Sequence, residues 1–95
     1  MNLDKYMKSK INRKIVRFFH ENPSSIDTTR GIATWINENV DETARALKEL
    51  VKAKILTVHG DSSTAAYGYT TDTHMVSKIH VSLRRLTTKK RKTHN

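Results

Sequence analysis

The sequence predicts a single α+β domain, mostly helical, with three core helices, a β-hairpin and an extra C-terminal helix. Up to Lys54 the apolar residues recur at steps of three and four, which is the spacing of amphipathic helices. After Lys54 two short β-prone runs flank a polar loop that contains glycine, which is the pattern of a hairpin. A chain of 95 residues has room for one core. We therefore expect one domain over 1–86 and a disordered basic tail over 87–95.

The first helix is expected from Leu3 to His20. Lysine and arginine fill much of the face opposite the apolar one. The helix should end in the Asn-Pro-Ser-Ser segment 22–25, because proline disfavours helical dihedral angles in the residue before it. Ile26 is then the only apolar residue of a short link. The apolar positions of this first helix are Leu3, Tyr6, Met7, Ile11, Ile15, Val16, Phe18 and Phe19.

The second helix is short and depends on tertiary packing. Any polar residue of the segment 27–29, Asp-Thr-Thr, can supply its N-cap. Its apolar positions are Ile32, Ala33 and Ile36, and Gly31 inside the pattern weakens it by about 1 kcal/mol relative to alanine. We expect Trp35 to lie partly buried at the edge of this helix, with a ligand or partner surface as the less favoured alternative.

A third helix begins directly after the segment 37–39, Asn-Glu-Asn, which breaks the periodicity. Asn39 or Asp41 can cap it. The residues expected on its buried face are Val40, Ala44, Leu47, Leu50 and Val51, and those expected on its outer face are Glu42, Thr43, Arg45, Ala46, Lys48, Glu49 and Lys52.

The hairpin and the last helix complete the domain. Residues 55–58 and 66–70 are β-prone and flank the turn residues 60–63, and Tyr67 and Tyr69 should pack on one face of the second strand. Asp72 or Thr73 can cap the last helix, whose apolar stripe is Met75, Val76, Ile79, Leu83 and Leu86. Nothing apolar follows Leu86.

The charge balance indicates an anionic partner. Eighteen Lys and Arg face nine Asp and Glu, which gives a formal net charge of +9. Such a surplus attracts polyanions, although charge alone does not separate DNA from RNA or a membrane surface. The chain has no cysteine, no apolar run long enough for a membrane span and no signal-peptide pattern. We therefore expect a cytoplasmic protein that does not associate with membranes.

Two segments carry a resemblance to a known family. They are Gly31-Ile32-Ala33-Thr34-Trp35-Ile36 in the second helix and residues 44–56, ARALKELVKAKIL, which lead from the third helix into the hairpin. With the order of elements around them, they resemble the winged helix-turn-helix superfamily of MarR- and ArsR-like bacterial regulators. The resemblance implies a DNA-binding transcriptional regulator, a projecting third helix and a hairpin "wing". Crossed helices of this kind leave the third helix free to enter a major groove.

The third helix, about 40–54, is the expected DNA-binding element. Arg45 is the first candidate for a base contact, because its guanidinium can donate to both major-groove acceptors of guanine. Thr43 is a candidate for a base or phosphate contact and Lys48 for a phosphate contact, and Lys52 is a further DNA-binding candidate. The segment 41–54 holds four basic and three acidic residues, so a solvated face on which Arg45 pairs with Glu49 is the alternative.

Further DNA contacts are expected from the wing and the tail. The wing loop has no Lys or Arg, so only Ser62, Ser63 and Thr64 are available to donate to phosphates. The tail carries Lys89, Lys90, Arg91 and Lys92, which suit a nonspecific arm or, equally, a solubilising segment. Residues 1–22 add six basic groups against two acidic ones.

The sequence predicts neither catalysis nor a cofactor. The five histidines lack the spacing of a metal pair on one helix face, and the three glycines form no phosphate loop. The partners expected are double-stranded DNA and, through residues 3–19 and 75–86, a second copy of the chain, with packing inside the monomer as the alternative. A protein-interaction module in a larger assembly and an RNA-binding winged helix are the competing functions.

Overall fold

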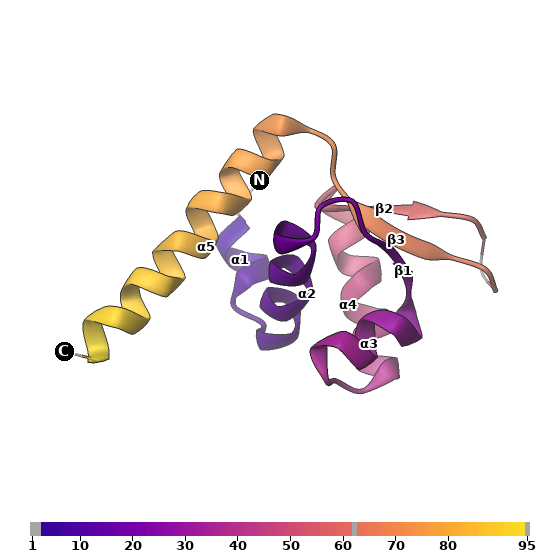
Figure 1. Cartoon of the computed structure of the whole chain (residues 1–95), viewed down its shortest axis with the longest axis horizontal. Coiled ribbons are helices and arrows are strands. Elements are labelled where there is room, and N and C mark those ends of the chain that lie inside the picture. The colour runs from indigo at the N-terminus through magenta and orange to yellow at the C-terminus, as the bar shows by residue number, and fades with distance from the viewer. Residues whose placement is uncertain (1–2, 62, 95) are drawn as a thin grey trace.

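The computed structural model describes the backbone of residues 3–61 and 63–94, and the side chains as far as Leu86. Five helices and three strands follow one another in the described chain (Figure 1). They are α1 (Leu3–Met7), α2 (Lys10–Glu21), β1 (Ile26–Thr28), α3 (Thr29–Ile36), α4 (Val40–Lys52), β2 (Leu56–His59), β3 (Ala66–Tyr69) and α5 (Thr73–His94). The fold is α+β and mostly helical, as predicted, and its order of elements is compatible with a winged-helix-like fold.

The prediction of one continuous helix over 3–20 is wrong, because the chain turns at Lys8 and Ser9 between α1 and α2. The Ser9 side chain caps α2 by accepting a hydrogen bond from the Asn12 amide. Arg13 Nη1 donates to the carbonyls of Met7 at 2.8 Å and Lys8 at 3.0 Å, which satisfies acceptors at the end of α1. Periodicity alone did not show these polar contacts.

Helices α3 and α4 form the predicted pair with a tight turn. Thr28 caps α3 through a 3.1 Å hydrogen bond from the Gly31 amide, and Asn39 caps α4 through a 3.0 Å bond from the Glu42 amide. Asn37 reverses the chain in the left-handed region, at φ 57°. Ile32, Leu47 and Leu50 are fully buried in the core, as expected from the sequence.

The predicted hairpin is present and belongs to a three-stranded antiparallel sheet in the order β1-β3-β2. The segment around Ile26 was expected to be only a link. It forms the strand β1, which pairs with β3, and Ile26 lies opposite Gly68. Three residues are too few to show strand alternation in the sequence. Tyr67 and Tyr69 are both buried on the core side of β3, and the Tyr69 ring stacks on Phe19 at 6.4 Å between centroids.

Helix α5 packs along α1 and α2, on the side of the molecule away from the sheet (Figure 1). Asp72 caps it, accepting a 2.9 Å hydrogen bond from the His74 amide. Ile79 and Leu83 of α5 are buried in the shared core with Leu3 of α1. No helix in the described part of the chain is both long and apolar enough to cross a membrane.

The backbone of α5 is helical through His94, past the expected domain end at Leu86. The side chains of residues 87–95 lie outside the described part of the chain. A disordered tail over 87–95 therefore stays a prediction.

Candidate nucleic-acid interface

Three basic residues form one stripe on the outer face of α4. Arg45, Lys48 and Lys52 are all exposed. Their spacing of three and four residues places them one above another on the side opposite the buried Leu47 and Leu50. The sequence predicted all three on this face, and the structure brings them together.

The predicted alternative, in which Glu49 neutralises Arg45, is not formed. Among the described side chains, the ion pairs join Lys14 to Glu38 at 2.6 Å and Arg85 to Asp4 at 3.0 Å. Glu49 instead accepts a 3.1 Å hydrogen bond from the Asn12 side chain. The cationic groups of the α4 stripe are thus left available to an external anion.

Thr43 is a correction to the predicted site. Its side chain was expected on the outer face of α4, but the residue is fully buried, with an exposed fraction of 0%. Thr43 lies four residues before Leu47 and therefore shares its inward direction. Its hydroxyl has no hydrogen-bond partner among the described residues. Ala46, also expected outside, is 7% exposed and belongs to the core.

The wing offers little to a phosphate. Ser63 and Thr64 are exposed at the hairpin tip, and Ser62 lies outside the described residues. The Thr64 hydroxyl already contacts the Asp61 carboxylate at 3.2 Å. An acidic residue at the tip opposes an approaching phosphate. Phosphate contacts from Ser63 and Thr64 therefore stay predictions.

The tail cations Lys89, Lys90, Arg91 and Lys92 have side chains outside the described part of the chain. Their role as a DNA-binding arm stays a prediction.

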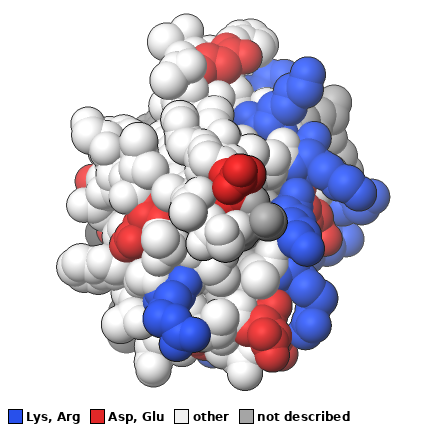
Figure 2. Space-filling model, turned by 90° about the vertical axis from the view of Figure 1, so that its right-hand side faces the viewer, with Lys and Arg blue, Asp and Glu red and all other residues white. Residues whose placement is uncertain are grey.

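Basic side chains are unevenly distributed over the side from which the hairpin projects. Figure 2 shows Lys and Arg gathered in a column along one edge of that face. Uncharged and acidic groups cover the centre of the same face. An elongated anion would therefore contact the edge of this face and avoid its centre.

Trp35 was expected to be partly buried, and this expectation is wrong. Its exposed fraction is 70%, the highest among the large exposed apolar side chains that the structure describes. Its ring lies 5.7 Å from that of Phe18, centroid to centroid. Trp35 precedes the buried Ile36 by one position, so the two side chains point about 100° apart around the helix axis. This angular offset was the sign in the sequence that Trp35 would be exposed.

Two histidines far apart in the sequence meet between α2 and α5. His20 Nε2 lies 3.2 Å from His80 Nδ1, and His20 Nδ1 lies 3.0 Å from the Tyr69 hydroxyl. The spacing of the histidines along the chain gave no sign of this pair, because the packing of α2 against α5 brings the two rings together. In the described part of the chain no three His, Cys, Asp or Glu side chains gather in a way that suits a metal ion.

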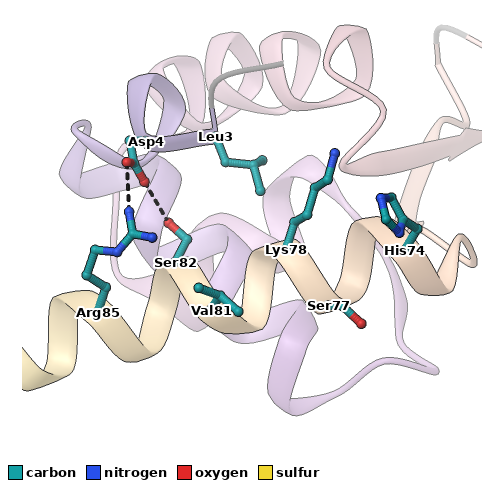
Figure 3. Close-up of a pocket in the computed structure, with 8 residues that line it drawn as sticks. All are labelled: Leu3, Asp4, His74, Ser77, Lys78, Val81, Ser82 and Arg85. Carbon is teal, nitrogen blue, oxygen red and sulfur yellow. Dashed lines mark hydrogen bonds and ion pairs between the residues drawn. The ribbon is translucent and has the colours of Figure 1, made fainter.

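A shallow groove of about 400 Å³ separates α1 from α5 (Figure 3). Asp4 accepts hydrogen bonds from Ser82 at 3.3 Å and Arg85 at 3.0 Å at one end of the groove. Val81 in its wall is 52% exposed. Burial of Leu3 against α5 means that much of the apolar surface considered for a dimer packs within the monomer.

A comparison with solved structures finds a protein of the same fold. It is a possible transcriptional regulator from Methanosarcina mazei Go1, with a TM-score of 0.65 and 16% sequence identity. The match covers 100% of this chain and 91% of that protein. No protein-family model and no curated protein matches the chain. At this identity the likeness establishes the fold of the chain but not its activity.

Proposed function

We propose that this chain is a winged helix-turn-helix DNA-binding protein that acts as a cytoplasmic transcriptional regulator and performs no catalysis. The observation that carries the proposal is the stripe of Arg45, Lys48 and Lys52, exposed and without an acidic partner among the described residues. The stripe lies on the second of two crossed helices, where a major groove can accept it. The resemblance to a possible transcriptional regulator in fold supports the same conclusion.

Within this proposal Arg45 reads a base edge, and Lys48 and Lys52 bind phosphates. Arg45 lies nearest the N-terminus of α4, the end that reaches base edges when a recognition helix enters the groove. Its guanidinium can donate to both acceptors of a guanine. The lysines follow on later turns and act as point charges beside the DNA backbone.

The test is a titration of labelled random duplex DNA at two salt concentrations, followed by fluorescence anisotropy. The triple variant Arg45→Gln, Lys48→Gln, Lys52→Gln should bind much more weakly. Each lost phosphate contact should reduce the slope of log affinity against log salt by about 0.9. A control with equal charge loss, Lys5→Gln, Lys78→Gln, Arg84→Gln, should retain more affinity. Absence of binding by the unmodified chain at low salt would overturn the proposal.

The tail enters the proposal as a nonspecific arm. Neutralising Lys89, Lys90, Arg91 and Lys92 together should lower affinity for all duplexes by a similar factor, since phosphate contacts carry no sequence information. Site selection from a random duplex pool should return the same sequence with and without this change. A changed target sequence would show that the tail reads bases.

A two-fold dimer is also proposed, because regulators that bind symmetric sites place two recognition helices one DNA turn apart. The apolar surface that remains available for a dimer contact consists of the exposed Val81 and the partly buried Tyr6, Met75 and Leu86. Sedimentation at micromolar concentration should show a dimer that Val81→Glu dissociates. A strict monomer removes the dimer and leaves DNA binding untouched.

A protein-interaction module is the second candidate function. Two observations favour it: the acidic pair Asp41 and Glu42 in the first turn of α4, and the exposed Trp35. Carboxylates at the end of a recognition helix repel phosphates, and tryptophan is enriched among the residues that anchor protein interfaces. Failure of the duplex titration at low salt would favour this function.

A further inference from the structure

An aromatic shelf lies on the surface where α2 and α3 meet. We define it as Trp35 of α3 and Phe18 of α2, whose rings are 5.7 Å apart and inclined by 34°. Phe18 is half-buried and supports the exposed Trp35 from the core side. With 70% of its surface exposed, the Trp35 ring offers a face on which a planar group can stack.

The shelf is held rigidly at the C-terminus of α3. Lys14 of α2 donates 3.0 Å to the Ile36 carbonyl, directly after Trp35, and 2.6 Å to the Glu38 carboxylate. The Asn37 amide bonds back to the Thr34 carbonyl in the helix cap. These contacts order the backbone on which Trp35 stands, so a ligand would not have to order it.

Two exposed cations of α2, Lys10 and Arg17, add positive charge near the shelf, where Lys14 is paired with Glu38. The hydrogen bond from Lys14, followed by the charges of Lys14 and Lys10, holds the pKa of the Glu38 carboxyl below its usual value against the opposing effect of burial. Lys10 and Arg17 are exposed on the outer face of the same helix, where Glu21 is the acidic exception. An anion next to Trp35 would thus be attracted by cations already in place.

We propose that the aromatic shelf, with Lys10 and Arg17, binds single-stranded nucleic acid. An unpaired base stacks on the exposed face of Trp35, and the neighbouring cations neutralise its phosphates. Duplex DNA hides the faces of its bases, so this ligand differs from that of the α4 stripe. The cationic rim also distinguishes the shelf from an apolar protein-docking surface, whose centre is depleted of charge. The inference does not depend on the function proposed for α4.

The chain contains a single tryptophan, so its intrinsic fluorescence reports on the shelf directly. Titration of the unmodified protein with oligothymidylate at low salt should quench this fluorescence, and added salt should weaken the binding. A duplex of the same length should compete poorly. Absence of quenching at low salt, or equal competition by the duplex, would overturn the proposal, and the former result would favour a protein partner for Trp35.

Matched variants separate the two surfaces, with binding followed by anisotropy of a labelled oligothymidylate. Trp35→Ala should lower affinity about tenfold or more, and Trp35→Phe should restore most of it. Both variants should fold, since Trp35 is exposed, and circular dichroism checks this. The Arg45→Gln, Lys48→Gln, Lys52→Gln variant should bind the oligonucleotide normally. If that variant loses the oligonucleotide while Trp35→Ala keeps it, the shelf is not the site, whatever the outcome for duplex DNA.

Discussion

The side chain of Asn12, on α2, donates a 3.1 Å hydrogen bond from Nδ2 to Oε1 of Glu49, on α4. Asn12 is only 3% exposed, and the same Nδ2 donates to the Tyr6 carbonyl at 2.9 Å. One buried amide thus joins the α1–α2 turn to the proposed recognition helix. It also engages the carboxylate that would otherwise be the nearest partner for Arg45 four residues earlier on the helix.

Asn12→Ala should destabilise the fold by about 1–3 kcal/mol, because it leaves the Tyr6 carbonyl without its donor in a partly buried contact. Urea unfolding followed by circular dichroism measures the change. The matched control is Glu49→Gln, whose amide oxygen still accepts the bond and which should cost less than about 0.5 kcal/mol. Equal losses for the two variants would show that the charge of Glu49, rather than the hydrogen bond, stabilises the contact.

Thr43→Val should stabilise the protein by about 1 kcal/mol. The Thr43 hydroxyl is fully buried and unpartnered among the described residues, and valine replaces it with a methyl group of nearly the same shape. Thermal unfolding at constant pH measures the gain. Duplex affinity should not change, since Thr43 does not reach the surface. A loss of affinity with the fold intact would restore Thr43 to the binding site.

Lys54→Gly should also stabilise the fold, by about 0.5–1 kcal/mol. Lys54 has φ 64° directly after α4, where the Ile55 amide bonds back to the Leu50 carbonyl at 3.0 Å. A lysine in this left-handed position is strained, and glycine is not. Lys48→Gly, inside the same helix, should instead destabilise by about 1 kcal/mol. Chemical denaturation of both variants tests the opposite signs.

The unmodified protein should lose stability at alkaline pH through Tyr69. Burial raises the pKa of Tyr69 to about 12, from 10.0 for a free tyrosine. Between these values the unfolded chain releases the phenolic proton and the folded chain retains it, so unfolding becomes more favourable as the pH rises from 10 towards 12.

The measurement is a series of denaturant midpoints across that pH range for the unmodified chain and Tyr69→Phe. The difference in stability between them should shift in favour of the phenylalanine variant as the pH rises. A constant difference would show that Tyr69 does not contribute to the alkaline loss. The comparison isolates the contribution of Tyr69 from that of every other group in the chain.

The elements with a periodic apolar pattern or a marked turn could be predicted from the sequence, whereas the break between α1 and α2 and the strand β1 could not. The α3–α4 pair, the hairpin and α5 follow from periodicity and from capping residues such as Asn39 and Asp72. The break at Ser9 and the strand at Ile26 depend on hydrogen bonds to distant residues, Arg13 on Met7 and Ile26 beside Gly68. Local patterns in the sequence contain no information on such pairings.

The proposed DNA-binding site likewise contains residues that the sequence alone could assign and residues that only the packing could place. Arg45, Lys48 and Lys52 could be assigned to one exposed face because their spacing matches the helical repeat. Thr43 points inward because of the way α4 is rotated against the core. The packing of the helix sets that rotation, and the apolar pattern of the sequence does not. Exposure of Trp35 likewise depends on how α3 lies against Phe18.

By itself the sequence determined the class of the fold, the order of its helices and hairpin, and the surplus of positive charge, because these are properties of local pattern and composition. Tertiary structure alone decided which side chains face outward and which distant groups meet, such as His20 with His80 and Asn12 with Glu49. The physical reason is that burial and hydrogen bonding are set by the packing of whole elements against one another. A helix pattern defines a face, and only its neighbours decide how much of that face remains exposed to solvent.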